Sequence, residues 1–180
     1  MGYTVRVTGV VVAILAVSIG LSGCAGESSD GSLSLLDTKL AVQLLRNTVS
    51  GQVSSASTED VSQVDDASEA CEDDADGFMR MWRSTALTEL TAERSGNVKA
   101  MVQTIAGGLT AKGWTSDAEQ KNDSKYTVEL ENPNAIGVIR ITSTEDVEGD
   151  DLGGTIFVEV TGPCVKTDGP GSDELTQVGE

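Results

Sequence analysis

Near its start the chain has a largely apolar run, Val7 to Leu21, which contains no charged residue and follows a single basic residue, Arg6. This is the layout of an N-terminal export signal. The run is about 15 residues long, whereas a helix that crosses the hydrocarbon core of a bilayer needs roughly 20. A permanent transmembrane helix is therefore the weaker interpretation, and we expect the folded domain to be built from the residues that follow.

The apolar run ends in Leu21-Ser22-Gly23-Cys24, which resembles the lipobox of bacterial lipoproteins at all four positions. The resemblance implies cleavage between Gly23 and Cys24 and transfer of a diacylglyceryl group to the Cys24 sulfur. It also implies that the protein is held at the outer face of the cell membrane through that lipid, because a pair of acyl chains anchors where one chain binds only marginally. A plain secretory signal and an uncleaved anchor are the alternatives.

The composition excludes several classes of function. Asp and Glu number 29 against 12 Lys and Arg, a formal charge of −17, and the loss of Arg6 with a cleaved signal would make this −18. Nucleic acid is an improbable partner, because phosphate binding depends on clustered basic residues. Anionic headgroups would repel such a domain, so the lipid on Cys24 would have to hold it at the membrane. The absence of histidine excludes a Ser-His-Asp triad, a Cys-His pair and imidazole ligation of a metal.

Three cysteines are an odd number for an exported protein. Lipidation of Cys24 would leave Cys71 and Cys164 as a pair, which we expect to form a disulfide in an oxidising exterior. Redox chemistry at this pair is less favoured, since Cys71 is followed by Glu72-Asp73-Asp74 and acidic neighbours disfavour the thiolate.

Hydrophobic periodicity predicts two helices. Ser34 or Asp37 caps the first, in which Leu36, Leu40 and Leu44 form one apolar stripe and Gly51 marks the end. The second carries a longer stripe and is capped by Ser95 or Asn97. The residues of that second stripe are Val98, Met101, Val102, Ile105 and Leu109.

Alternation of apolar and polar residues predicts strands at about 78–90, 126–131, 135–144 and 155–161, with a further strand starting at Trp114. In the segment 155–161, Ile156, Val158 and Val160 are expected on one face. Residues 52–70 are expected to form a long connection, with room for one extended segment. Short turns between strands favour antiparallel pairing. The predicted fold is an α+β two-layer sandwich, with an antiparallel sheet of about four strands and two helices on one face.

The expected organisation has four parts. Residues 1–23 form the lipoprotein signal peptide and residues 24–34 a flexible tether of small polar residues. Residues 35–165 form a single α+β domain, and residues 166–180 form a disordered acidic tail.

Several motifs suggest sites without selecting one. Glu72 to Gly77 is similar to the start of a calcium-binding loop, but Arg83 occupies the position of the last acidic ligand. A cluster of solvent-exposed acidic residues is therefore the better explanation. The same explanation is favoured for the acidic residues of 145–151. Arg80 and Arg83 flank Trp82, an arrangement that would hold an anion or simply surround a core tryptophan. No catalytic residue, metal ligand or cofactor motif stands out.

The exported part is similar to the small lipoproteins of actinobacteria, which combine a lipobox, a tether and a compact α+β domain. The resemblance carries over no catalytic residue. It favours a non-enzymatic binding or accessory domain at the membrane surface, with the membrane as its partner through Cys24 and another envelope protein as a further partner. A carrier with an apolar cavity between sheet and helices is the alternative. A hydrolase without histidine is a third hypothesis.

Overall fold

The computed structural model describes residues 33–72, 76, 78–91, 98–121, 124–145 and 152–169. Both helices precede residue 111, and the elements after it are all strands. In chain order they are α1 (Leu35–Ser57), β1 (Gln63–Ala70), β2 (Met79–Thr91), α2 (Val98–Thr110), β3 (Thr115–Lys121), β4 (Lys125–Glu131), β5 (Val138–Thr144), β6 (Leu152–Thr161) and β7 (Val165–Lys166).

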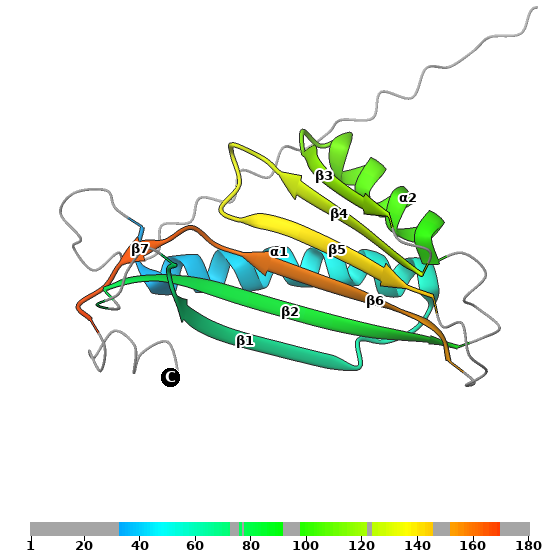
Figure 1. Ribbon diagram of the computed structural model, residues 1–180, viewed down its shortest axis with the longest axis horizontal. Helices are drawn as coiled ribbons and strands as arrows, with labels where there is room; N and C mark the ends of the chain where they lie inside the picture. Colours follow the sequence, from blue (N-terminus) through cyan, green and yellow to red (C-terminus); the bar gives the residue numbers. More distant parts are fainter. Residues whose placement is uncertain are drawn as a thin grey trace, which may run out of the picture. The chain divides into compact units, whose positions relative to one another are not determined.

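The strands form one antiparallel sheet in the order β1-β2-β6-β5-β4-β3, and β7 pairs with the start of β2 (Figure 1). The α+β class is confirmed, but the expected number of about four strands is wrong, since six strands lie on the main path and β7 adds a seventh. Strand β1 lies within the connection expected at residues 52–70 and was not counted in the sheet, because its sequence, QVDDASEA, has little intrinsic strand preference. It forms at the sheet edge through backbone pairing with β2, from Gln63 opposite Leu87 to Ala70 opposite Arg80.

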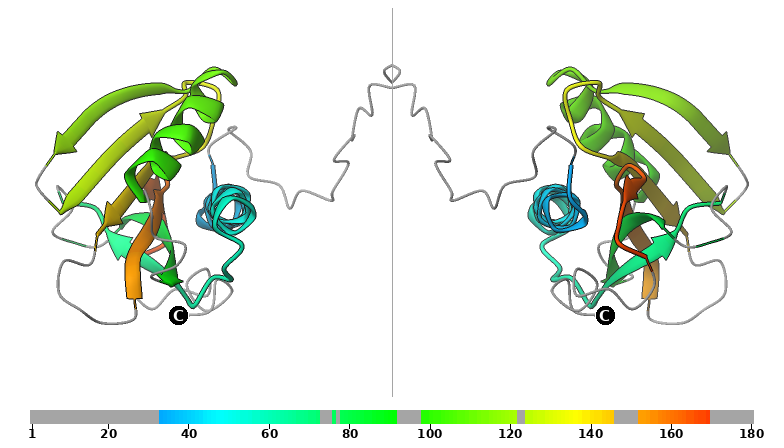
Figure 2. Two further views of the ribbon diagram at one scale, coloured as in Figure 1. Left: turned by 90° about the vertical axis from the view of Figure 1, so that its right-hand side faces the viewer. Right: turned by 90° about the vertical axis from the view of Figure 1, so that its left-hand side faces the viewer.

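Both helices cover the same face of the sheet, as predicted, and Figure 2 shows α1 end-on beside that face. Helix α1 contacts β2 and β6, while α2 contacts β4, β5 and β6. Helix α1 begins at a capping box, in which the Asp37 N–H donates to Ser34 Oγ (3.1 Å) and the Ser34 N–H donates to the Asp37 carboxylate (3.4 Å). The predicted end at Gly51 is wrong: burial of Val53 and Ser57 continues the helix to Thr58, which caps it in the left-handed region.

The prediction for the buried face of α1 is also wrong. Leu36, Leu40 and Leu44 are exposed, and the helix turns its other apolar stripe toward the sheet. The buried positions of α1 are Leu35, Thr38, Val42, Arg46, Val49, Ser50, Val53 and Ser57. Smaller side chains occupy this face because α1 crosses the end of β6 very closely: a Cβ on Gly162 would lie 2.3 Å from the Thr38 methyl group and 3.0 Å from a Val42 methyl group.

The core lies between the helices and the sheet. The predicted stripe of α2 is confirmed, with Val98, Val102, Ile105 and Leu109 buried, and so is the inward face of β6. A contiguous cluster of buried side chains joins these elements. Its strand members include Trp82, Ala86, Leu90, Tyr126, Val128, Leu130, Ile139, Ile141, Ile156, Val158 and Val160.

The described domain extends slightly beyond the predicted boundaries of 35 and 165. Residues 166–169, expected in the acidic tail, instead pack against the sheet: Lys166 pairs with Met79, and the Thr167 N–H donates to the Phe78 carbonyl oxygen (2.7 Å). The predicted signal peptide, all but the last two residues of the predicted tether, and residues 170–180 lie outside the described residues. Within the described ranges, no helix has the combined length and apolar character needed to cross a bilayer.

Candidate interaction surface

The predicted disulfide between Cys71 and Cys164 is present, with an S–S distance of 1.97 Å and Cα atoms 6.2 Å apart. Cys71 follows β1 directly and its N–H donates to the Met79 carbonyl oxygen (3.0 Å). Cys164 lies in the short connection between β6 and β7. The bond therefore links two chain segments that both border the start of β2, 93 residues apart in sequence. The predicted cleavage and lipidation site, Gly23 and Cys24, lies outside the described residues.

The acidic motifs lie largely outside the described residues too. Only Glu72 and Asp76 of the calcium-like segment and Glu145 of the 145–151 loop are described, and all three are exposed. Among the described residues, no three Cys, Asp or Glu side chains are grouped in a way that could hold a metal ion.

Arg80, Trp82 and Arg83 are not brought together as one site. Trp82 is buried in the core at 3% exposure, with the Lys39 ammonium 4.8 Å from its ring centroid. Arg80 lies on the same side of β2 and donates to the Ser68 hydroxyl (2.5 Å) and carbonyl oxygen (2.9 Å). Arg83 points to the opposite face of the sheet, since alternate residues of a strand face opposite ways. The alternative of a core tryptophan is therefore confirmed.

Arg83 belongs to a ladder of alternating charges on the helix-free face of the sheet. Glu129, Arg140, Glu159, Arg83 and Glu69 follow one another across β4, β5, β6, β2 and β1. The successive nitrogen-to-oxygen distances are 2.5, 3.1, 3.8 and 2.6 Å. The hydrogen bond that Arg140 donates to the Glu129 carboxylate raises the pKa of Arg140, and the one that Arg83 donates to the Glu69 carboxylate raises the pKa of Arg83.

This ladder was not expected from the sequence, because its members are 10 or more residues apart and only the strand register aligns them. It lines a shallow hollow of about 570 Å³. Each arginine in the hollow already pairs with two glutamates. The ladder therefore pairs its charges internally, three carboxylates with two guanidiniums, and it offers no arginine free of an ion pair to an incoming anion.

A second polar cluster, also missed from the sequence, lies beneath α1. Arg46 is buried, and its guanidinium donates to the Ser84 hydroxyl (2.9 Å), the Asn47 side-chain oxygen (2.7 Å) and the Asp66 carboxylate (3.2 Å). Gln43 donates to the same Asp66 oxygen at 3.1 Å. The cluster joins α1 to β1 and β2. It explains why a polar strand such as β1 is held at the sheet edge.

The outer side of α1 carries a row of exposed leucines, which we call the leucine row: Leu33, Leu36, Leu40 and Leu44. Their exposed fractions are 41%, 39%, 57% and 69%. Large apolar side chains scattered singly over a surface are ordinary, whereas a contiguous patch marks a surface that contacts something. The leucine row supplies four of the six exposed large apolar side chains among the described residues.

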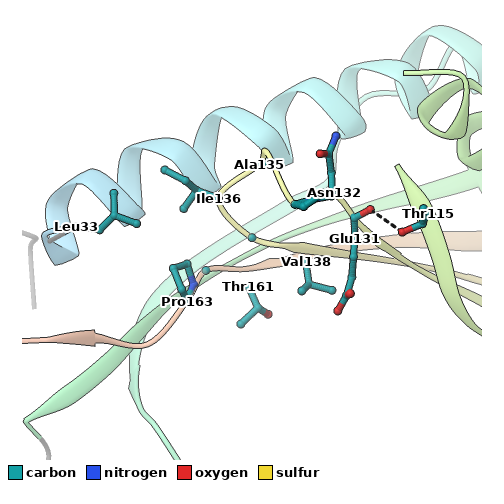
Figure 3. Close-up of a pocket in the computed structure, with 12 residues that line it drawn as sticks. Leu33, Thr115, Glu131, Asn132, Ala135, Ile136, Val138, Thr161 and Pro163 are labelled. Atoms are coloured by element: carbon teal, nitrogen blue, oxygen red, sulfur yellow. Dashed lines mark hydrogen bonds between the residues drawn. The ribbon is translucent and has the colours of Figure 1, made fainter. Parts of the chain in front are cut away.

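Two hollows lie beside the leucine row and share Ala135 and Ile136, which belong to the turn between β4 and β5. The first, of about 380 Å³, lies between Leu33 and the ends of β4, β5 and β6. Figure 3 shows Leu33 and Ile136 beside α1, with Val138 and Pro163 on the strand side of this hollow. The second, of about 360 Å³, lies along α1 at Leu44 and Leu45. Both hollows open at the surface, outside the packed layer between helices and sheet.

Comparison with protein-family models, with curated proteins and with solved structures gives no match to this chain. The site must therefore be judged from its own chemistry. On the described surface, the open sheet face presents charges that pair with one another, whereas α1 presents apolar area with shallow hollows at its side. The leucine row is the described surface best suited to binding.

Proposed function

We propose that the protein is a lipid-anchored protein of the bacterial cell envelope, held at the outer face of the membrane through Cys24. In this proposal the folded domain is a non-enzymatic binding or accessory domain. The observation that carries the proposal is the disulfide: Cys71 and Cys164 pair with each other, so Cys24 is the one cysteine of three left for another role. That cysteine is the last residue of the lipobox-like sequence.

The disulfide also supports the expected compartment. Structural disulfides form and persist outside the reducing cytoplasm. The bond closes a segment of 93 residues around β2, which is the arrangement of a structural bridge rather than of an exposed redox pair. Cys71 is almost fully buried, at 9% exposure. An exported domain with this bridge and an acidic surface has no electrostatic attraction to anionic headgroups, so the lipid is the element that keeps it there.

The binding role is supported by the distribution of polar and apolar surface. The leucine row leaves apolar area uncovered, at a cost in solubility that a purely structural surface would avoid. The ladder on the other face, in contrast, is satisfied within the domain. We therefore place the binding role on α1.

Anchoring is tested by replacing the lipid acceptor in cells. Cys24→Ala should release the protein into the medium or leave an unprocessed precursor, because no thiol remains for the diacylglyceryl group. Ser29→Ala, a change of similar size in the same predicted tether, should leave the protein in the membrane fraction. Mass spectrometry of the mature N-terminus reports the modification directly. Equal membrane retention of both variants, with an unmodified Cys24 in the parent chain, would contradict the proposal.

A further inference from the structure

The outer face of α1 carries very little charge for a chain as acidic as this one. The helix has nine exposed residues, and only Asp37 among them is charged, although the chain carries 29 acidic residues. The two basic residues of α1 do not face outward: Lys39 lies over the Trp82 ring, and Arg46 is buried against Ser84 and Asp66. The leucine row therefore lies on a nearly uncharged strip of a strongly acidic protein.

We propose that α1 rests on the lipid bilayer in the anchored protein, with Leu36, Leu40 and Leu44 at the boundary between headgroups and acyl chains. This inference rests on the proposed lipid anchor at Cys24. The strip approaches anionic headgroups with little repulsion, because nearly all of the acidic residues lie elsewhere. The outer side of α2 is also free of acidic residues, but none of the exposed large apolar side chains of the described residues lies on it.

The position of the row in the chain supports this choice. Only nine residue steps separate Cys24 from Leu33, where the described chain and the leucine row both begin. Nine residue steps span at most about 30 Å, whatever their conformation. An anchor at Cys24 thus holds the start of the row close to the headgroups, and α1 needs only to lie down along the surface.

The size of the row distinguishes a bilayer from a second copy of the chain. The exposed fractions of the four leucines together equal about two fully exposed leucine residues. A stable dimer buries about 800 Å² on each partner, roughly twice that area. Two domains of this charge would also repel each other. For a membrane contact the area suffices, since the acyl chains already hold the protein and the leucines have only to orient it.

The experiment uses the mature acylated protein, reconstituted into phosphatidylcholine vesicles. In Leu40→Cys, residue 40 is the only free thiol, because Cys24 is acylated and Cys71 is bonded to Cys164. A polarity-sensitive fluorophore is attached there, and brominated lipids serve as quenchers. Lys125→Cys is the matched control, since this exposed residue lies next to inward-facing Tyr126 and so faces away from the helices.

We expect a blue-shifted emission at residue 40 and lipid quenching at least about threefold greater than at residue 125. Adding Leu36→Gln and Leu44→Gln should abolish this difference without releasing the protein. Anionic lipid should not increase the quenching, because the strip has no basic rim. Water-like emission at both positions would overturn the proposal. A blue shift that increases with protein density and is not accompanied by lipid quenching would also overturn the proposal, because it would indicate contact between copies of the protein.

The same preparation distinguishes failure of the proposed lipid anchor from failure of the proposed orientation of α1. An unmodified Cys24 in the mass spectrum contradicts the proposed anchor. An acylated Cys24 together with a probe at residue 40 that stays in water contradicts only the orientation of α1.

Discussion

Gly162 is the position at which a single methyl group should most clearly disturb the packing of α1 on the sheet. A Cβ at this residue would lie 2.3 Å from the Thr38 methyl group and 3.0 Å from a Val42 methyl group, whereas carbon atoms in contact are normally about 3.5–4.0 Å apart. Both neighbours are β-branched residues of a helix, whose side chains have little rotational freedom. The Thr38 hydroxyl also donates to the Ser34 carbonyl oxygen (3.0 Å), which resists rotation of the side chain.

The helix would therefore have to move away from β6. Overpacking of this kind costs about 1–3 kcal/mol, and we expect Gly162→Ala to fall toward the upper end, with a melting temperature lower by about 5–10 °C. Gly51→Ala makes the same chemical change at an exposed position of α1, where nothing lies within 4 Å of the new methyl group. That variant should gain about 0.5–1 kcal/mol, because alanine replaces glycine within a helix.

Urea unfolding followed by the fluorescence of Trp82 and Trp114 measures both variants, since both indoles are buried in the folded state. The expected result is a lower midpoint for Gly162→Ala and a higher one for Gly51→Ala, with unchanged slopes. If Gly162→Ala unfolds at the same urea concentration as the parent chain, the close approach of α1 to β6 is not a constraint on this fold. A loss of similar size in Gly51→Ala would equally refute the reasoning.

Three further changes probe the disulfide and the two arginine clusters. Cys71→Ser with Cys164→Ser should lower the free energy of unfolding by about 4–5 kcal/mol, from the entropy of a loop near 100 residues; a urea-derived loss below about 1 kcal/mol would contradict this. Arg46→Met should cost about 2–3 kcal/mol by thermal unfolding, because the partly buried Asp66 loses its cation. Arg140→Met, in the half-exposed ladder, should cost less than about 1 kcal/mol, and equal losses would contradict the contrast. The folded-state pKa of Arg140 is raised, so its contribution to the free energy of unfolding is fully present below the ordinary arginine pKa and is lost only as the pH rises above that pKa. The destabilisation caused by Arg140→Met should therefore be equal at pH 6 and pH 10.

The elements predicted well are those with a single apolar face that can be buried in the core. Helix α2 has a single stripe from Val98 to Leu109, and β6 places Ile156, Val158 and Val160 on one face, with Phe157 as the apolar exception on the other. Local periodicity is then sufficient, because burying any other face would place polar groups in the core. The pairing of Cys71 with Cys164 could likewise be predicted from the sequence, because assigning Cys24 to the lipid leaves only these two of the three cysteines.

Helix α1 shows where local pattern fails. It carries two apolar stripes, one through Leu36 and Leu40 and one through Val42 and Val49, and periodicity alone favours the larger side chains. The sheet selects the smaller ones because Gly162 brings the helix backbone close to β6. The leucines are left outside, so the same tertiary choice that corrects the fold prediction also creates the candidate binding surface.

The sequence by itself determined the α+β class, the two helices on one face, the inward faces of α2 and β6, and the disulfide. These follow from patterns within short segments and from the count of cysteines. The tertiary structure alone decided the side of α1 that is buried, the recruitment of β1 through Arg46 and Asp66, and the ladder from Glu129 to Glu69. Each of these depends on how closely distant segments approach and in which register they pair, which are properties of the assembled layers and not of any one segment.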